Sequence, residues 1–559
     1  MSVAFGAVYT RPWTANLILD LAGYRAEENL VDMMAVEPAA GDGAFLIPMI
    51  ERLVSSCRRQ ARLLKECARS LTAYELEEAA ADQLRKATGD KLTDLGISKV
   101  EAQKLTSSWI KNGDFLLDAG RHNGTSLPFK DDAAQEKNSG VDFVIGNPPY
   151  IRLEEIPQNR NTLYRSMFST MRGRADIYVA FYEAALRLLK PGGVCAFICA
   201  DRWMVNHYGI ELRRLITSEY SVEAVIEMHN AEAFETEVDA YPAITVIRRA
   251  EQGQVLVARA GSTARERDAS ASAFLLRNFT KGSNGAPLPE GFEGCRADGW
   301  FKGGDPWPCT SPKRLALLKH LEERFPPLES PVSETKVGIG VATGLDEVFI
   351  TKDSGLVERD RLLSIAVTSD IATGTFKWSG SYLINPWTEE GLVDLKDFPG
   401  LRKYFEEHRD KLEKRHVARV HKRNWYRTID RVNLELLKKS KLYVPDIKNT
   451  IHPVLDEGTS YPHHNLYFII SNRWDLRVLG ALLMSDVGKF FVESYGVRMR
   501  GGYLRMQAQY LRRIRLPLPE QIPPAQSQAL VDAFDERDAA EATRMALKVY
   551  GIDGIPPEE

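Results

Sequence analysis

The 559-residue sequence predicts an α/β domain in its first half and an α+β domain in its second half. In the first ~250 residues, apolar strand-like runs alternate with helical patterns, which is typical of a parallel sheet with helices on its faces. From about Val332 to Pro519 the pattern changes to short strands, aromatic residues and basic helices. A chain of this length exceeds what one hydrophobic core covers, so several domains are expected.

Six apolar runs in the first half are predicted strands: Met33–Glu37, Leu71–Glu75, Phe143–Gly146, Val194–Ala200, Ala224–Met228 and Ala243–Ile247. Four segments with helical periodicity are predicted helices: Ala44–Ser70, Leu76–Thr88, Ile177–Lys190 and Gly209–Ser218. Pro191-Gly192-Gly193 is a helix stop that leads into the next strand.

Changes of composition suggest four parts of the chain. Residues 1–250 form the α/β domain, and residues 251–331, rich in Gly, Ser and Pro, form a connector with some local order. Residues 332–520 form the α+β domain, and residues 521–559 contain a helix, Ser527–Tyr550, followed by a Pro-Glu tail.

The sequence shows no feature of a membrane-spanning or secreted protein. Apolar residues make up 44% of the chain, but we find no uninterrupted apolar run of ~18 residues and no signal-peptide pattern. The six cysteines show no Cys-x-x-Cys pairing, so we expect buried free thiols in a reducing cytoplasm rather than disulfides or a metal site. They are Cys57, Cys67, Cys195, Cys199, Cys295 and Cys309.

Positive charge gathers in the C-terminal half although the net charge is −3. Residues 401–441 contain fourteen Lys and Arg against six Asp and Glu. A second basic segment runs from Arg498 through Arg500 and Arg505 to Arg515. Such concentration predicts a surface that contacts phosphates, with a merely solvated helix face as the alternative for residues 401–423.

The most informative stretch is Asn147-Pro148-Pro149-Tyr150, which ends a predicted strand. This turn suits the methylation of a nitrogen whose lone pair is conjugated, because such a nitrogen needs acceptors for its N–H protons. The Asn147 side-chain oxygen and the Pro148 carbonyl are the two predicted acceptors. The prolines fix φ and donate no N–H, and Tyr150 offers a flat face for a planar substrate.

A glycine turn after the first predicted strand is a candidate cofactor site. Gly41 and Gly43 let the backbone approach a ligand at the carboxyl end of that strand. Glu37 and Asp42 would repel a pyrophosphate but suit the sulfonium and ammonium of S-adenosylmethionine. A purely structural glycine turn is the alternative.

Two further acids follow later strand-like runs. Glu75 ends the second run, where a carboxylate can accept from both ribose hydroxyls. Asp114 follows a third apolar segment and could accept from the adenine amino group of the cofactor. Either acid could instead cap a helix N-terminus. Glu37, Glu75 and Asp114, placed in order after successive strands and followed by the Asn147 turn, favour a cofactor site.

With these residues the chain resembles the gamma-class amino-methyltransferases of restriction–modification systems, which make N6-methyladenine in DNA. The resemblance covers roughly residues 5–250, with a looser likeness from 335 to 520. The matching motifs are Val8-Tyr9-Thr10-Arg11-Pro12, the loop from Glu37 to Phe45, Glu75, Asp114, Asn147–Tyr150 and Asp176–Phe181. The interval from Glu37 to Glu75 exceeds the usual spacing of about 20 residues, and an elongated helix around Leu53–Cys67 would absorb the excess.

The resemblance implies a Rossmann-like S-adenosylmethionine-dependent methyltransferase domain with a C-terminal α+β target-recognition domain. It implies methyl transfer to a flipped-out adenine in double-stranded DNA, with a separate cognate restriction endonuclease as a further partner. The implied cofactor residues are Tyr9, Thr10, Glu37, Ala39, Gly41, Gly43, Phe45, Glu75, Asp114 and Asn147. The implied catalytic residues are Asn147, Pro148 and Tyr150.

The resemblance also implies which residues meet the DNA. Phe234 is the first choice for a second aromatic on the target base, Tyr241 is the second choice, and a core phenylalanine is the alternative for Phe234. Arg498, Arg500 and Arg505 are the predicted DNA-contacting arginines, near the close of the target-recognition domain.

Three other functions are alternatives to methylation of adenine in DNA. A protein-glutamine methyltransferase uses the same kind of turn but resembles a compact single-domain chain. An RNA adenine methyltransferase and a DNA-binding protein with an inactive methyltransferase domain are further alternatives. Pro445-Asp446-Ile447-Lys448 is too short a match to predict a nuclease and is better explained as a strand end.

Overall fold

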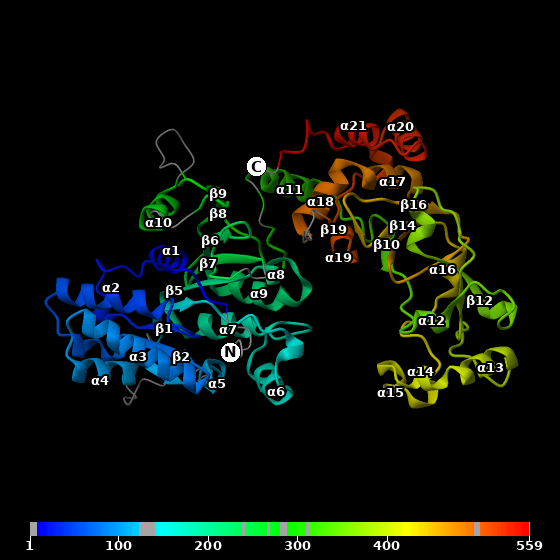
Figure 1. Ribbon diagram of the computed structural model, residues 1–559. Coiled ribbons are helices and arrows are strands. Elements are labelled where there is room, and N and C mark those ends of the chain that lie inside the picture. The colour runs from blue at the N-terminus through cyan, green and yellow to red at the C-terminus, as the bar shows by residue number, and fades with distance from the viewer. Residues whose placement is uncertain are drawn as a thin grey trace. The chain divides into compact units, whose positions relative to one another are not determined.

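The computed structural model describes residues 8–121, 140–236, 241–264, 269–279, 288–308, 310, 312–496 and 503–557. The chain divides into two compact units, Met1–Pro312 and Lys313–Pro557 (Figure 1). Each unit is described by itself.

The first unit is built on a nine-stranded sheet in the order β3-β2-β1-β4-β5-β7-β6-β8-β9. The strands are β1 (Ala35–Glu37), β2 (Leu71–Glu75), β3 (Ile110–Asn112), β4 (Val141–Gly146), β5 (Leu189–Ala200), β6 (Ser221–Glu227), β7 (Pro242–Arg248), β8 (Gln254–Ala260) and β9 (Phe292–Asp298). From β3 to β5 the neighbours are parallel, and β7 lies antiparallel between β5 and β6. Because β1 lies between β2 and β4, the strand order reverses at the β1–β4 pair, where open α/β sheets bind ligands.

Helices cover both faces of this sheet (Figure 1). One face packs against α1 (Pro12–Ala22), α2 (Leu46–Arg59), α3 (Glu78–Asp94), α4 (Lys99–Trp109) and α10 (Ala269–Asn278). The other packs against α5 (Phe115–Arg121), α6 (Gln158–Met167), α7 (Ile177–Leu188), α8 (Arg202–Val205) and α9 (Ile210–Glu219). Successive strand residues point to opposite faces, so Val144 joins one core and its neighbour Ile145 joins the other. The predicted α/β fold class is confirmed.

Each of the six predicted strands overlaps an observed strand, but the predicted helix Ala44–Ser70 is wrong as a single element. α2 ends at Arg59, and a separate 3-10 helix spans Leu64–Arg69. Between them Ala61 has φ of 53°, a left-handed conformation that a right-handed helix does not continue through. The two helices together occupy the long interval between Glu37 and Glu75.

The structure differs from the predicted connector, residues 251–331, because strands in this stretch extend the sheet. β8 pairs in parallel with β6, and β9 pairs antiparallel with β8. Val255 and Val257 of β8 join one core and Leu256 between them joins the other, so this strand is covered on both faces. The two seven-residue strands were missed because the stretch between them is rich in Gly and Ser, and the first compact unit extends to Pro312.

The second unit contains two four-stranded sheets and a two-stranded ribbon. The first sheet has the order β10-β18-β14-β16, formed by Thr335–Ile339, Leu466–Ser471, Lys441–Pro445 and Val454–Asp456. The second has the order β11-β13-β12-β17, formed by Ile350–Thr351, Tyr382–Ile384, Leu362–Ala366 and Tyr461–Pro462. The ribbon pairs β15 (Ile447–Lys448) with β19 (Leu504–Arg505).

Short helices accompany these sheets, in agreement with the predicted α+β class. They are α11 (Pro312–Arg324), α12 (Asp346–Phe349), α13 (Pro399–Glu407), α14 (Arg409–Glu413), α15 (His416–Val420), α16 (Leu434–Lys438), α17 (Leu476–Met484), α18 (Asp486–Tyr495), α19 (Ala508–Leu511), α20 (Pro524–Asp535) and α21 (Ala539–Tyr550). The predicted helix Ser527–Tyr550 is wrong as one element, because Arg537 takes a left-handed φ of 59° and Asp538 caps a new helix.

Two predicted properties concern the whole chain. The five cysteines in the described ranges, Cys57, Cys67, Cys195, Cys199 and Cys295, are buried, and none of them forms a disulfide; Cys309 lies outside those ranges. Among the described helices, none has both the length and the apolar character that crossing a membrane requires.

Candidate active site

The first strand ends in a glycine turn that leads into α2. Gly41 and Gly43 have φ of 53° and 92°, a backbone region that side chains with a Cβ rarely adopt. A Cβ at position 43 would also lie 2.8 Å from Cδ1 of Leu84. Glycine is therefore favoured at position 43 chiefly by the backbone conformation, and a larger residue would also displace the Leu84 side chain.

The Glu75 carboxylate braces this turn from the end of the neighbouring strand. Its Oε2 accepts the backbone N–H of Gly41 at 2.9 Å, and its Oε1 accepts the backbone N–H of Glu77 at 2.9 Å. A carboxylate that accepts two amide protons stays oriented. Glu75 thus has a structural role in addition to the predicted cofactor contact.

Glu37, the last residue of β1, is a buried acid with an unused oxygen. Its side chain is 1% exposed and accepts the backbone N–H of Leu46, the first residue of α2. Its Oε2 has no hydrogen-bond partner in the described part of the chain. Burial, followed by the negative charges of Asp42 and Glu75, raises the pKa of Glu37 well above its usual value. A cation bound nearby would relieve this accumulation of negative charge.

Asp114 lies after β3 and has partners for both oxygens. Oδ1 accepts the backbone N–H groups of Leu116 and Leu117 and so caps α5, which is the alternative role considered for this acid. Oδ2 accepts the Tyr164 hydroxyl at 2.6 Å. Tyr164, on α6, is a residue that the sequence did not single out, since nothing in its local pattern distinguishes it from a core aromatic.

Asn147 begins the turn after β4, and its amide group is held in one orientation. Nδ2 donates to the Val8 carbonyl at 2.8 Å and to Oγ1 of Thr10 at 3.1 Å. A carbonyl only accepts hydrogen bonds, so the nitrogen must face Val8. Oδ1 is buried, and no described residue donates to it.

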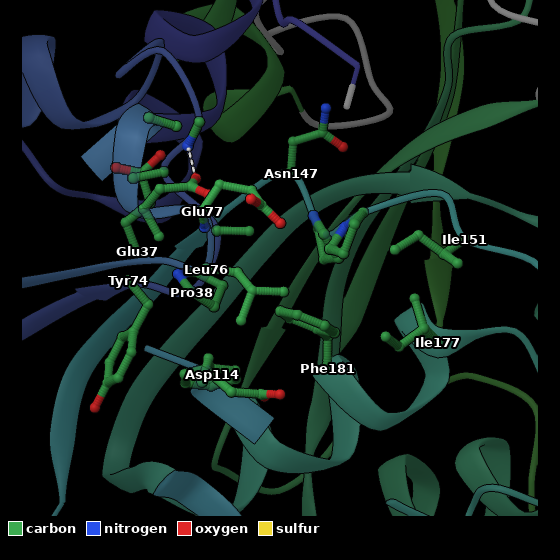
Figure 2. A pocket seen from close by; sticks show the side chains of 18 of the residues that line it. Glu37, Pro38, Tyr74, Leu76, Glu77, Asp114, Asn147, Ile151, Ile177 and Phe181 are labelled. Carbon is green, nitrogen blue, oxygen red and sulfur yellow. Dashed lines mark hydrogen bonds between the residues drawn. The ribbon is translucent and has the colours of Figure 1, made fainter. Parts of the chain in front are cut away.

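A cavity of about 570 Å³ opens at the carboxyl ends of β1, β2 and β4. Figure 2 shows Glu37, Asp114 and Asn147 around this one space, with Ile177 and Phe181 of α7 on its apolar side. All the predicted cofactor residues except Gly43 line it, namely Tyr9, Thr10, Glu37, Ala39, Gly41, Phe45, Glu75, Asp114 and Asn147. Pro148 and Pro149 line it as well, whereas Gly43 only shapes the turn beside it.

The N-terminal segment joins this cavity to a loop more than 200 residues later in the sequence. Thr10 forms a β-bridge with Phe234, and the Arg11 N–H donates to the Ala233 carbonyl at 2.9 Å. The Glu235 N–H donates in turn to the Tyr9 carbonyl at 3.0 Å. The segment therefore contacts Asn147 on one side and positions Phe234 on the other.

Phe234 lies next to Tyr150, as the resemblance implies, but the two rings are perpendicular. Their centroids are 6.2 Å apart and their planes meet at 82°. A planar group stacked on the face of Tyr150 would therefore meet Phe234 at a steep angle and not as a parallel second face. Neither ring lines the cavity, but both lie beside residues that do, because Tyr150 follows Pro149 in the chain and Phe234 forms a bridge with Thr10.

The second-choice aromatic, Tyr241, packs elsewhere. Its ring lies 5.1 Å from that of His229 and 4.9 Å from the Arg202 guanidinium. His229 itself bonds to Asp201 at 2.7 Å and to Glu227 at 3.2 Å. Burial lowers the pKa of His229, but the hydrogen bonds to these two carboxylates outweigh it and raise the pKa to about 9.

Of the three predicted DNA-contacting arginines, Arg505 alone lies within the described residues. Arg498 and Arg500 lie outside the described residues. Arg505 is 42% exposed and donates to Asp446 at 2.6 Å, so the Asp446 carboxylate of the short nuclease-like match is engaged in an ion pair.

Other basic residues of the second unit also have internal partners. Arg512 pairs with Glu329, and Arg513 and Arg515 both approach Glu322 at 3.4 Å. Arg415 donates to the carbonyls of Thr343 and Trp425. Part of the basic character is therefore structural.

The chain matches two protein-family models. Residues 54–234 match the Eco57I restriction-modification methylase model, and residues 395–518 match the TaqI-like C-terminal specificity domain model.

Close sequence relatives cover nearly the whole chain. The Type II methyltransferase M.XhoI of Xanthomonas vasicola is 40% identical over 554 residues, which is 98% of this chain and 97% of the relative. The Type II methyltransferase M.PaeR7I of Pseudomonas aeruginosa is also 40% identical over 554 residues, covering 98% of this chain and 92% of the relative.

Among solved structures, the Type IIL restriction-modification enzyme MmeI in complex with DNA is similar with a TM-score of 0.56 and 12% identity. The similarity covers 97% of this chain and 73% of MmeI. At this identity the likeness concerns the fold alone.

Proposed function

This chain belongs to the Type II methyltransferases of restriction–modification systems, and on that premise we propose that it methylates N6 of adenine in double-stranded DNA with S-adenosylmethionine as donor. The proposal goes beyond membership of the family in three respects. The target base is adenine, the methylated atom is its amino nitrogen, and named residues of this chain act on that nitrogen.

The observation that carries the proposal is the free oxygen of Asn147. Oδ1 is a buried acceptor without a donor among the described residues, and Nδ2 is tied to Val8 and Thr10, so the oxygen cannot exchange places with the nitrogen. A buried acceptor without a partner costs about 1–3 kcal/mol, which an incoming N–H would recover. An exocyclic amino group supplies such an N–H.

Pro148 provides the second acceptor in this proposal. Proline fixes its own φ and lacks an N–H, so the Asn147–Pro148–Pro149 corner holds its carbonyls in place without donating to a substrate. An amino nitrogen between Asn147 Oδ1 and the Pro148 carbonyl gives each proton an acceptor. Electron density can then shift to the nitrogen, and the displaced proton leaves to solvent after transfer. No general base is required.

The residues around the cavity fit S-adenosylmethionine. Its volume of about 570 Å³ falls in the usual range for small-ligand pockets, about 300–1,000 Å³. Glu37 and Asp42 would face the cationic methionine part, Glu75 would accept from the ribose hydroxyls, and Phe181 with Ile177 offers an apolar wall for a ring. When bound, S-adenosylmethionine supplies an electrophilic methyl group. The chain's own residues orient the acceptor amine.

A paired base cannot reach this turn, so we propose that the adenine is flipped out of the duplex. Extrusion costs a few kcal/mol, and stacking on an aromatic ring returns about 1–3 kcal/mol per base. Tyr150 supplies the stacking face, and the perpendicular Phe234 supplies a contact at the edge of the base. Residues 332–520 would recognise the target sequence, with Arg498, Arg500 and Arg505 near phosphates, and a cognate restriction endonuclease would be the separate partner.

The test is methyl incorporation by the full-length protein from labelled S-adenosylmethionine. Mixed-sequence duplex DNA, RNA and a glutamine-containing peptide are offered separately, and the modified nucleoside is identified after digestion. We expect N6-methyladenine in duplex DNA only. Label in N4-methylcytosine would refute the choice of base, and label in RNA or peptide would refute the choice of polymer.

A further inference from the structure

A group of metal-binding side chains lies in the second unit. Asp346, His463 and His464 each place one ligand atom within 4.8 Å of the other two, and this is the one group of its kind in the part of the chain that the structure describes. We propose that these three side chains bind a divalent transition-metal ion. Two imidazoles and a carboxylate match the ligand preference of zinc.

The pair formed by His463 and Asp346 defines the inner part of the site. Nε2 of His463 lies 3.0 Å from Oδ2 of Asp346. Zinc lies about 2.0–2.2 Å from nitrogen and oxygen ligands. Two such bonds together are longer than the 3.0 Å between Nε2 and Oδ2, so one ion can contact both atoms. The His463 side chain is 6% exposed and that of Asp346 is 43% exposed, so the site is anchored in the protein and opens to solvent at the carboxylate.

His464 supplies the third ligand. Its Nδ1 is buried and has no hydrogen-bond partner among the described residues. The two imidazole rings lie 4.0 Å apart between centroids, with their planes tilted by 56°. Buried imidazole nitrogens normally have a partner. Coordination to an ion shared with His463 would give this nitrogen one.

The backbone holds both histidines in place before any ion binds. The His463 N–H donates to Ala366 at 3.0 Å, and the His464 N–H donates to Val341 at 3.1 Å. Gly340 lies so close to this turn that a Cβ there would be 2.1 Å from the His463 carbonyl oxygen. A site with a fixed backbone loses little freedom when the ion binds.

Asp346 is oriented by a further contact. Thr343 Oγ1 donates to Oδ1 of Asp346 at 2.5 Å, which leaves Oδ2 facing His463. Metal-binding carboxylates commonly have such a supporting hydrogen bond. Three protein ligands leave one position of a tetrahedral zinc for water, in keeping with the half-exposed carboxylate.

Asp346 lies at the start of α12, and the two histidines lie in the turn between β17 and β18. Asp346 and His463 are 117 residues apart in the sequence. A bound ion would cross-link these segments and stabilise the loop from Gly340 to Asp346. The alternative is that Asp346 only orients His463 through a hydrogen bond, in which case the chain binds no ion here.

Zinc titration of the full-length, chelator-treated protein at neutral pH separates these two cases. We expect one equivalent of zinc per chain by calorimetry, and a cobalt titration should give the visible absorption of a tetrahedral site. Loss of an outer-shell partner typically weakens metal binding by about 10–100-fold, so removing a ligand through Asp346→Asn or His464→Asn should weaken it by at least ~100-fold.

The matched control is His421→Asn, which changes an exposed histidine in the same unit and should bind zinc as the wild type does. Circular dichroism of each variant establishes that it is folded. The proposal is overturned if the wild type takes up no zinc, or if Asp346→Asn and His464→Asn, folded like the wild type, bind zinc with unchanged affinity.

Discussion

The side-chain amide of Asn147 donates a 2.8 Å hydrogen bond to the carbonyl of Val8, which lies 139 positions earlier in the chain. This contact decides which way the amide faces, because the Val8 carbonyl can only accept. The buried oxygen that results is the feature of the site with the clearest chemical consequence.

Replacing Asn147 by alanine should lower the rate of methyl transfer by at least ~10²–10³-fold, the usual effect of deleting one positioned hydrogen-bonding group. Cofactor affinity should change little, because the side chain is only one part of a large cavity lining. Turnover and calorimetric binding of S-adenosylmethionine measure the two effects. Asn147→Asp keeps an acceptor oxygen but loses the donor to Val8, so it should retain part of the activity. An Asn147→Ala enzyme with normal turnover would contradict the assigned role.

Tyr150 should act through its ring and not through its hydroxyl. The hydroxyl is buried without a partner among the described residues, so Tyr150→Phe should retain activity and unfold at the same or a slightly higher temperature. Tyr150→Ala removes the stacking face and should weaken productive DNA binding by about 5–150-fold, corresponding to ~1–3 kcal/mol. Comparing KM for DNA in the two variants tests this. Equal defects in both would point to the hydroxyl instead.

Glu37 should make the cofactor-free protein less stable as pH rises. Burial and the charges of Asp42 and Glu75 raise its pKa in the folded state, so its favourable contribution is complete below the unfolded value of about 4.3 and is lost as pH rises through the folded value. Glu37→Gln should therefore raise the melting temperature at neutral and alkaline pH, change it little in acid, and weaken cofactor binding. Thermal unfolding across pH, with and without S-adenosylmethionine, measures both. A variant that is less stable than wild type at alkaline pH would argue against this origin of the shift.

Glu75 should affect the cofactor through the glycine turn. Glu75→Ala removes the acceptor for the Gly41 and Glu77 amides, and hydrogen bonds to a charged group contribute about 1.5–3 kcal/mol. We expect S-adenosylmethionine affinity to fall by ~10–150-fold. Glu75→Gln keeps one acceptor oxygen and should lie between alanine and wild type. The control is Glu78→Gln on the neighbouring exposed turn of α3, which should bind the cofactor normally.

The sheet and the acids at its edge could be predicted because they leave local traces in the sequence. Strands covered on both faces form continuous apolar runs, and Glu37, Glu75 and Asn147 stand directly where such runs end. The glycine spacing also marked the turn at Gly41. These features depend on neighbours in the sequence.

Contacts between distant segments could not be predicted in the same way. Nothing near Tyr164 indicates that its hydroxyl meets Asp114, and nothing near Thr10 indicates a bridge to Phe234. The helix breaks at Ala61 and Arg537 were missed because a left-handed conformation is unusual for residues other than glycine and has no marker in the sequence.

The position of strand β8 in the sheet limits where two related chains can be joined to exchange their C-terminal domains. A chimera joined at residue 250 would take β8 from the other parent or lose it, although β8 pairs with β6 along four residues from Ala224 to Glu227. An unpaired β6 would present an open apolar edge, which favours aggregation. Hybrid enzymes should therefore be spliced beyond β9, after Asp298, so that each parent contributes an intact sheet.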